Sequence, residues 1–596
     1  MNIEEGLRRK TGGQWLVNPV GKETVFCREM FTDEHKEVKK MIEQFSQEKI
    51  YPKIKDLDSL NENLSRTILQ EMGELGLIGV DTPEEYGGIE LDKITSCIVA
   101  EGVSWGGSAS FGCTFGVQTG IGSLGIVFFG TPNQKKKYLP KLMTGDWIAA
   151  YGLTEPSAGS DALSAKTTAI LSEDGKHYIV NGEKQFISNG GWADVYTILV
   201  QIDGNKFSAL IVDRGTEGLE VGAEEKKMGM KGSSTTSLKF INAKVPVENL
   251  LYKVGKGAAI AFNALNIGRY KLGAAGVGGS KLAIKETVKY ALERRQFGQP
   301  IAKFDSIKGK IADATVQIYS IDTMLYRTVG MIQEAIDELD KGNDEYYILM
   351  GEVMERFAIE SSMAKIYGSE TSMMVVDNCF QIFGGYGYIE EYPMAMPYRD
   401  DRINRIWEGT NEINRAIITG YMMKKVLMEE ISLRDFLSDF DEFSFSEVKR
   451  DGSDPLLVEK HALLASKKLA AYIFQAALIK FGQDLKHKQL LSESIADIFT
   501  HIYISGSVIS RVSQTISSND HSKMTLAIAK IRTAESLTKI KGLISNCQNN
   551  IFKSLSDESV KTTINNMMEK LSISTDTIAL KKILADFIFA QKKYPF

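Results

Sequence analysis

The first part of the chain carries the hydrophobic spacing of α-helices. Apolar residues over positions 38–45 recur at the i, i+3, i+4, i+7 interval, and Thr32 precedes them as a helix-capping residue. A second stripe of this kind covers residues 68–75. The pattern predicts an N-terminal segment over residues 1–29 and a helical domain over residues 30–150.

After residue 165 the apolar runs become short and rich in valine, isoleucine, threonine and tyrosine. Such runs, separated by turn pairs that contain glycine, are typical of β-hairpins. Runs 195–200 and 207–212 flank one of these turn pairs, as adjacent antiparallel strands do. We therefore predict a middle antiparallel β domain over residues 151–252. Its turn pairs are Asp174-Gly175, Asn181-Gly182, Asn189-Gly190 and Asp203-Gly204.

Long helical patterns resume beyond the β region and predict a second helical domain over residues 253–430. Repeated serine, aspartate and glutamate over residues 431–455 predict a linker, and residues 456–596 form a third helical block, the C-terminal extension. The predicted fold class is therefore α+β and mostly helical. A stripe of apolar residues near the C-terminus predicts an amphipathic helix: Leu580, Ile583, Leu584, Phe587 and Ile588.

The C-terminal extension is mildly basic. Residues 441–596 hold 21 Lys+Arg and 16 Asp+Glu, a balance of +5, in a chain whose formal net charge is −5. We interpret the extension as a helical cap whose lysines solvate its outer face. Docking to a membrane surface or to a partner is the alternative.

Composition narrows the class of protein. At 596 residues the chain exceeds the ~250–300 residues that one hydrophobic core supports, so several packed units are expected. Its 43% hydrophobic and 25% charged residues are those of a soluble globular protein, and its negative charge predicts no nucleic-acid surface. Residues 1–13 lack an apolar signal region, which predicts a cytoplasmic location. Five scattered cysteines without a C-x-x-C pair predict neither a disulfide framework nor a metal site.

The stretch over residues 406–413 holds the candidate for acid–base chemistry. Glu408 is followed by Gly409, whose backbone permits close approach to a ligand and whose amide can donate to a developing enolate oxygen. No histidine lies between residues 178 and 460, so a base in this region must be a carboxylate, a lysine or a tyrosine. A surface carboxylate before a helix N-terminus is the alternative interpretation of Glu408.

Three further motifs suit a cofactor. Residues 381–387 form a glycine-rich turn with room for a planar or phosphorylated group, although the full G-x-G-x-x-G pattern is missing and tight helix packing also explains it. Residues 151–161 lie where the first helical domain meets the β domain, which suits a cofactor cleft or an ordinary turn. Arg294, within residues 293–298, suits a pyrophosphate, with a solvated surface charge as the alternative.

In their order and spacing, these four motifs resemble the acyl-CoA dehydrogenase family over residues 30–425. The resemblance implies a helical domain, a β domain and a four-helix domain, with FAD between the last two. One set of residues would line the flavin, and a second set, drawn partly from a partner subunit, would hold its pyrophosphate and adenosine. The first set is Tyr151, Leu153, Thr154, Gly159, Ser160, Phe186, Ile187 and Ser188, with Thr410 and Glu412 as the remaining FAD contacts; the second is Arg294, Phe297, Gln381, Gly384 and Gly385.

The resemblance also assigns the substrate side of the site. Glu408 matches the family base, which takes the α-proton of an acyl-CoA while the β-hydride passes to flavin N5, giving a trans-2-enoyl-CoA. Some relatives carry the base at the position of Gly268, where a glycine cannot serve. Arg269 would face the CoA portion with Ser160 nearby, and Gly409 would lie beside the substrate.

Two features resemble the very-long-chain branch of the family. One is the helical extension, and the other is the pair Gly122 and Gly125, whose small size would leave room for a long acyl tail; close helix packing is the alternative. The branch implies a homodimer, and in some members the extension contacts the inner membrane surface. We therefore predict dehydrogenation of a long-chain acyl-CoA in fatty-acid β-oxidation, with electrons passing to electron-transfer flavoprotein. An acyl-CoA oxidase and a scaffold protein on the same fold are the alternatives.

Overall fold

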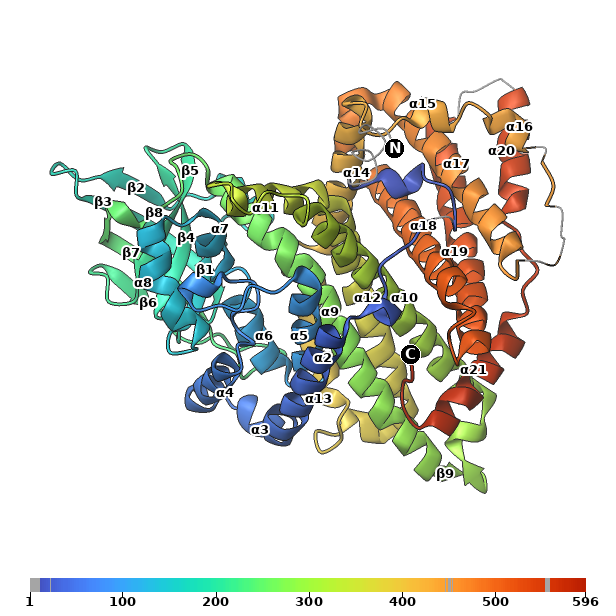
Figure 1. Cartoon of the computed structure of the whole chain (residues 1–596), viewed down its shortest axis with the longest axis horizontal. Coiled ribbons are helices and arrows are strands. Elements are labelled where there is room, and N and C mark those ends of the chain that lie inside the picture. Colours follow the sequence, from blue (N-terminus) through green and yellow to red (C-terminus); the bar gives the residue numbers. More distant parts are fainter. Residues whose placement is uncertain (1–10, 22, 445, 449–451, 453, 553–557) are drawn as a thin grey trace.

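The computed structural model of the chain describes residues 11–21, 23–444, 446–448, 452, 454–552 and 558–596. The β domain lies at one side of the molecule, long helices cross the middle, and the C-terminal extension lies at the other side (Figure 1). Residues 1–10 of the predicted N-terminal segment, and residues 445, 449–451 and 453 of the predicted linker, lie outside the described residues.

The N-terminal helical domain begins as its pattern predicts. The Thr32 hydroxyl accepts a hydrogen bond from the His35 amide at 3.2 Å, and His35 Nδ1 accepts from the Thr32 amide at 3.2 Å, so the first long helix has a capping box. Ile42 and Phe45 of the predicted stripe are buried. The α-helices of this domain are α2 (Asp33–Phe45), α3 (Ile54–Leu57), α4 (Glu62–Glu74), α5 (Lys93–Ser104), α6 (Ala109–Gln118), α7 (Leu124–Phe129) and α8 (Pro132–Met143).

Short helical turns connect the longer elements. A π-helical turn, η3 (Ser46–Ile50), follows α2 directly. The 3₁₀ turns are η1 (Gln14–Leu16), η2 (Arg28–Met30), η4 (Tyr51–Lys53), η5 (Glu84–Tyr86), η6 (Ala162–Ser164), η7 (Val247–Asn249), η8 (Ile301–Lys303), η9 (Gly384–Tyr388), η10 (Arg402–Arg405) and η11 (Gly482–His487).

The β domain is one sheet with the strand order β6-β7-β3-β2-β4-β5-β8, and β1 pairs with β4. Most pairs are antiparallel, but β4 runs parallel to both β1 and β2, so the sheet is mixed where the sequence predicted an antiparallel one. A separate two-stranded ribbon joins β9 and β10. The strands are β1 (Ala149–Gly152), β2 (Thr168–Leu171), β3 (His177–Ser188), β4 (Val195–Ile202), β5 (Lys206–Asp213), β6 (Leu219–Val221), β7 (Thr235–Pro246), β8 (Leu250–Leu251), β9 (Arg295–Gln296) and β10 (Gln299–Pro300).

Two of the four predicted hairpin turns are confirmed. Asp174-Gly175 joins the paired strands β2 and β3, and Asp203-Gly204 joins β4 and β5. Asn181-Gly182 lies inside β3, where the pairing with β7 shifts register; a Cβ at Gly182 would stand 2.6 Å from the Thr167 hydroxyl, so the glycine permits a close approach and not a chain reversal. Asn189-Gly190 follows β3 but leads to β4, which does not pair with it.

The second helical domain is built around four long helices. The helix α12 lies at its centre and packs against α9, α10 and α14. The helix α9 also packs against α5 of the first domain, so it connects the two helical domains. The helices are α9 (Gly257–Glu293), α10 (Asp305–Ile336), α11 (Tyr346–Arg356), α12 (Ala358–Phe383), α13 (Ala395–Asp401) and α14 (Asn411–Leu427).

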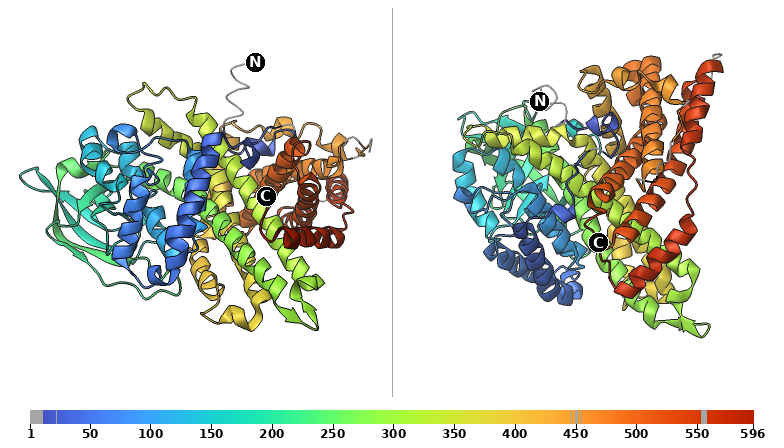
Figure 2. Two further views of the ribbon diagram at one scale, coloured as in Figure 1. Left: turned by 60° about the horizontal axis from the view of Figure 1, so that its bottom comes forward. Right: turned by 45° about the vertical axis from the view of Figure 1, so that its right-hand side comes forward.

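The C-terminal extension packs on the four-helix domain, with α18 and α21 against α10 and α18 against α14 (Figure 2). In α21 the predicted stripe contributes to this packing, because Leu584 and Ile588 are buried. The helix-rich stretch Leu457–His487 is apolar and long enough to cross a membrane, but two-thirds of its most apolar window is buried inside the protein. The helices are α15 (Leu433–Phe436) and α16 (Phe440–Ser444), within the predicted linker, then α17 (Leu457–Phe481), α18 (Gln489–Thr515), α19 (Ser522–Ile551), α20 (Glu558–Lys570) and α21 (Thr577–Gln591).

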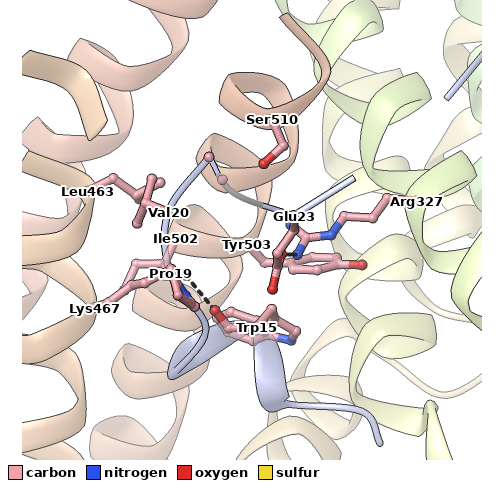
Figure 3. Close-up of a pocket in the computed structure, with 12 residues that line it drawn as sticks. Trp15, Pro19, Val20, Glu23, Arg327, Leu463, Lys467, Ile502, Tyr503 and Ser510 are labelled. Atoms are coloured by element: carbon pink, nitrogen blue, oxygen red, sulfur yellow. Dashed lines mark hydrogen bonds and ion pairs between the residues drawn. The ribbon is translucent and has the colours of Figure 1, made fainter. Parts of the chain in front are cut away.

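Residues 11–31, which we call the N-terminal strap, join the extension to the four-helix domain. The Trp15 indole packs on Tyr503 of α18 with ring centroids 5.1 Å apart, and its N–H donates to Glu360 of α12 at 3.0 Å. Beside it, the buried Lys467 ammonium of α17 donates to the Trp15 carbonyl at 2.6 Å, and Glu23 pairs with Arg327 of α10 at 2.6 Å (Figure 3). The strap therefore holds helices of two domains together.

Candidate active site

Glu408 lies in a tight turn between η10 and α14. Its φ is +57° and that of Gly409 is +78°, so two successive residues adopt the left-handed conformation that a side chain disfavours. The Asn414 side-chain amide donates to the carbonyls of Gly409 at 2.9 Å and Thr410 at 3.0 Å, and the Thr410 hydroxyl caps α14 by accepting from the Ile413 amide. A strained residue persists where its surroundings fix it, and such residues gather at functional sites.

The Glu408 carboxyl group lies in a setting that favours proton transfer. Its Oε2 atom is buried and has no hydrogen-bond partner in the part of the chain that the structure describes. Burial raises the pKa of Glu408 to about 7, although the charges of Arg269 and Lys365 oppose the rise. A carboxylate with a pKa near neutrality can both take and release a proton, as a general base must.

Two residues of α9 shape this carboxyl site. A Cβ on Gly268 would stand 2.8 Å from Glu408 Oε2, so the glycine leaves the space that the carboxylate occupies. The neighbouring Arg269 is only 4% exposed; its Nε donates to the Glu408 carbonyl at 3.2 Å and its Nη1 to the Asn266 side chain at 2.8 Å. The Arg269 guanidinium is thus directed at the Glu408 turn, and its contact with the CoA portion stays a prediction.

One predicted flavin residue, Tyr151, lies close enough to Glu408 to experience its charge. Tyr151 of β1 is buried with its hydroxyl unpaired among the described residues, and burial together with the Glu408 charge raises its pKa. Ser188 is half-buried at the end of β3. The pKa of the buried Cys113 thiol of α6 is raised by burial and, more weakly, by the Glu408 charge. The unpaired Tyr151 hydroxyl and Glu408 carboxyl oxygen are the groups that a bound ring and thioester would satisfy.

The remaining residues of the first set are, apart from Ile187, less buried than Tyr151. Phe186 has a φ of +59° and is 58% exposed, so its ring is free on the surface while the adjacent Ile187 is buried. Leu153 and Thr154 are half-buried, and Ser160 is exposed. A Cβ on Gly159 would meet open space. Glu412 is exposed in the first turn of α14, where its own amide and the Thr410 hydroxyl lower its pKa.

The second set of predicted cofactor residues lies at the other end of α9. The Arg294 guanidinium stands over the Tyr386 ring at 5.3 Å, next to Gly384 and Gly385, where an added Cβ would meet nothing within 4 Å. Phe297 is 93% exposed at the tip of the β9–β10 ribbon, and Gln381 is exposed in the last turn of α12. This end of the bundle presents an open basic and aromatic surface.

The two sets are far apart within one chain. Arg269 contacts the Glu408 turn. Arg294 lies 25 residues later, at the C-terminal end of α9. At 1.5 Å per residue, this separation is about 37 Å, which is longer than one flavin dinucleotide. In Figure 1, β9 lies at the end of the bundle away from the β domain.

The two glycines predicted to leave room for an acyl tail are sites of close packing. A Cβ on Gly122 would stand 2.8 Å from both the Ala149 Cβ and the Val117 carbonyl. A Cβ on Gly125 would stand 3.3 Å from Ile260. The structure therefore supports the packing alternative at these positions, and they give no evidence for a long-chain tunnel.

Sequence reasoning missed Lys365, a buried lysine of α12 whose ammonium reaches the Glu408 turn. A single charged residue within the apolar run 363–367 was the available signal. Among the described residues, no group of histidine, cysteine, aspartate and glutamate side chains is arranged to hold a metal ion.

Comparison with known proteins divides the chain into the same domains as the structure. Family models match residues 32–146 (acyl-CoA dehydrogenase, N-terminal domain), 150–243 (middle domain), 255–423 (C-terminal domain) and 458–573 (ACAD9/ACADV, C-terminal domain). A probable acyl-CoA dehydrogenase of Bacillus subtilis (strain 168) is 43% identical over 513 residues, 86% of each chain. The mitochondrial very long-chain specific acyl-CoA dehydrogenase of Homo sapiens is 34% identical over 531 residues, 81% of this chain and 77% of that protein.

One solved structure covers the extension as well as the rest. The crystal structure of an acyl-CoA dehydrogenase complexed with FAD from Bacillus anthracis has a TM-score of 0.94 and 39% identity, and it covers 98% of this chain and 100% of its own.

Proposed function

The chain belongs to the acyl-CoA dehydrogenase family of FAD-dependent oxidoreductases, and on this premise we propose that it removes one hydrogen from each of the α and β carbons of a long-chain acyl-CoA. Glu408 takes the α-proton, and the product is the trans-2-enoyl-CoA. FAD, when bound, supplies the acceptor for the β-hydride. The observation that carries the proposal is the buried, unpaired Oε2 atom of Glu408 in a fixed turn, where burial raises the pKa of the carboxyl group to about 7.

The surrounding residues fix the position of the Glu408 carboxylate for this step. Arg269 and Asn414 hold the carbonyls of its turn, so the carboxylate starts from one position. Gly268 leaves the space for that position. The exclusion of water that accompanies acyl-CoA binding would strengthen the electrostatic interactions here and favour proton transfer from the acidic α carbon.

The long-chain preference rests on the extension and on the very-long-chain relatives. Since Gly122 and Gly125 are packed, they do not contribute to it. The test is an anaerobic titration of the purified holoprotein with hexadecanoyl-CoA, octanoyl-CoA and butanoyl-CoA, following the flavin absorbance band. We expect bleaching that is strongest with the C16 thioester, and Glu408→Gln should keep its yellow flavin and bind acyl-CoA while losing most turnover. An unbleached flavin with every chain length would refute the proposed reaction.

The separation of the two cofactor sets supports a homodimer. If each FAD uses Tyr151 and Ser188 of one subunit with Arg294 and Gly385 of the other, the 37 Å gap along α9 is no obstacle, because a two-fold axis brings the opposite ends together. Mixing Glu408→Gln and Arg294→Ala subunits tests this arrangement. Hybrid dimers have one intact site, so random exchange should restore about a quarter of the wild-type rate. Two variants that stay inactive after proven exchange would contradict a shared site.

Electron acceptor, location and membrane contact complete the proposal. Electron-transfer flavoprotein is the acceptor that the family suggests, and reduction of purified electron-transfer flavoprotein by substrate-reduced enzyme tests it.

All five cysteines are free and buried, which fits a reducing cytoplasm. Ile479 and Leu490 are more than 80% exposed on the extension; Lys480 follows the first, and Lys488 lies two positions before the second. This favours peripheral contact with an anionic membrane, which co-sedimentation with vesicles measures.

A further inference from the structure

Lys365 of α12 is a buried lysine whose ammonium group contacts the Glu408 turn. Its side chain has no exposed surface, and its Nζ donates to the Gly409 carbonyl at 2.8 Å and to the Asn411 side-chain oxygen at 2.7 Å. Within the described residues, no carboxylate lies within ion-pair distance of it. The ammonium group is therefore held by the turn itself.

The position of this cation is unfavourable for folding alone. Asn411 is the first residue of α14, so the ammonium group stands at a helix N-terminus, where the helix dipole disfavours positive charge. Burial further penalises the charge and lowers the pKa of Lys365 to about 7, although the Glu408 charge raises it. Since both the helix dipole and burial make the Lys365 charge unfavourable for the folded state, this lysine is a candidate for a role in the reaction.

The network around Asn411 fixes the direction of this contact. The Asn411 amide nitrogen donates to the Ser369 hydroxyl at 3.1 Å and to Glu370 at 3.0 Å, so its oxygen faces Lys365. Asn414 holds the Gly409 carbonyl from the other side at 2.9 Å. The Gly409 carbonyl thus receives two donors, and the Gly409–Thr410 peptide cannot rotate without breaking both.

We propose that Lys365 is a positioning residue for the α-proton abstraction assigned to Glu408: it locks the Glu408–Gly409 turn through the Gly409 carbonyl, and its charge favours the ionised carboxylate. This inference rests on the proposed function, because it gives Lys365 a part in the same step. It assigns the lysine no contact with substrate or flavin. Its effect passes through the base.

The charged and titratable groups that act on this pair come from five elements. Arg269 of α9 and Lys365 of α12 favour the Glu408 carboxylate. Tyr151 of β1 and Cys113 of α6 face Glu408 as neutral groups, because burial raises the pKa of each. Lys365 itself also experiences, in addition to the Arg269 charge, the carboxylates of Glu370 in α12, Glu412 in α14 and Glu408 in the turn. Loss of Lys365 removes one of the two cations that favour ionisation of Glu408.

The test compares wild type, Lys365→Met and Lys365→Gln in two measurements. The first is the pH dependence of flavin bleaching by hexadecanoyl-CoA in the holoprotein. We expect its acid limb to move up by about one pH unit in both variants, since an opposite charge nearby shifts a carboxyl pKa by about 1–3 units. The second is an infrared titration of the protonated carboxyl band that Glu408→Gln lacks, which reports the ionisation of Glu408 without turnover.

Lys467→Met is the matched control. Lys467 of α17 is 4% exposed, donates to two backbone carbonyls, and has a pKa lowered to about 7 by burial, but the carbonyls that it contacts belong to the N-terminal strap. We expect this variant to lose thermal stability and keep both pH curves. Should Lys365→Met fail to fold, Lys365→Gln, which keeps a donor for Gly409, carries the same comparison.

Unchanged pH curves in both Lys365 variants would overturn the inference. A wild-type flavin that no acyl-CoA bleaches would defeat the proposed function instead, and the infrared titration would still decide whether Lys365 controls the ionisation of Glu408.

Discussion

Substitution of Gly268 by alanine tests whether the space beside Glu408 is needed for its reaction. The added methyl group would begin 2.8 Å from Oε2 and 2.9 Å from Cδ of Glu408. Non-bonded contacts prefer about 3.5 Å or more, so the carboxylate must withdraw by about 0.7 Å. Since a misplacement of about 1 Å can cost a hundredfold in rate, we expect a loss of about 10- to 100-fold, or about 1.4–2.7 kcal/mol in the activation free energy.

The same helix provides the control. Gly279 also lies within α9, but a Cβ there would meet nothing within 4 Å. Each Gly→Ala change gains about 1 kcal/mol of helix propensity, so Gly279→Ala should raise the unfolding temperature and keep the rate of flavin bleaching. Gly268→Ala should retain flavin and fold while it loses rate. A wild-type bleaching rate in Gly268→Ala, with the flavin fully bound, would refute the assignment of the carboxylate position.

Three further outcomes follow from the same geometry. The rate of flavin bleaching should fall as pH drops below about 7, because the pKa of Glu408 is raised to that value and only its carboxylate accepts a proton; stopped-flow rates between pH 5.5 and 9 at ~0.5-unit steps would measure this limb. The folded-state pKa of Glu408 lies above its ordinary 4.5, so its contribution to stability is present below pH 4.5 and lost as pH rises through 7. At pH 8 Glu408→Gln should therefore resist urea better than wild type, by up to about 3 kcal/mol. Equal urea midpoints would contradict the burial of the Glu408 charge. Trp15→Ala removes the ring that packs on Tyr503 and a donor to the buried Glu360, so the free energy of unfolding should fall by about 3–5 kcal/mol in urea titration, and a loss below about 1 kcal/mol would mean that the strap contributes little.

The sequence predicted the elements better than their pairing. The helix after Thr32 and the hairpins at Asp174-Gly175 and Asp203-Gly204 depend on local spacing and turn residues, and they are confirmed. Asn181-Gly182 carries the same local signal but serves a bulge against Thr167. The parallel pairing of β4 with β1 and β2 depends on chain crossings that no short pattern encodes.

At the site, motif order predicted which residues matter and left their grouping open. Glu408 and Tyr151 lie together, as the flavin interpretation requires. The burial of Arg269 and the packing at Gly122 depend on contacts between distant segments, so their residue types alone could not reveal them. Lys365 stood out only as a lone charge in an apolar run, because its contacts depend on the turn that α14 brings to it.

The extension is physically connected to the catalytic turn. Asp497 of α18 accepts from Arg415 of α14 at 2.7 Å, and Arg415 also pairs with Glu370 of α12 at 2.9 Å. Glu370 in turn accepts from Asn411, the residue that holds Lys365. The first contact joins α18 to α14 and the others join α14 to α12, so the position of α18 bears on α12 and α14 together. The extension therefore contributes to the rigidity of the Glu408 turn as well as covering the outer face of the four-helix domain.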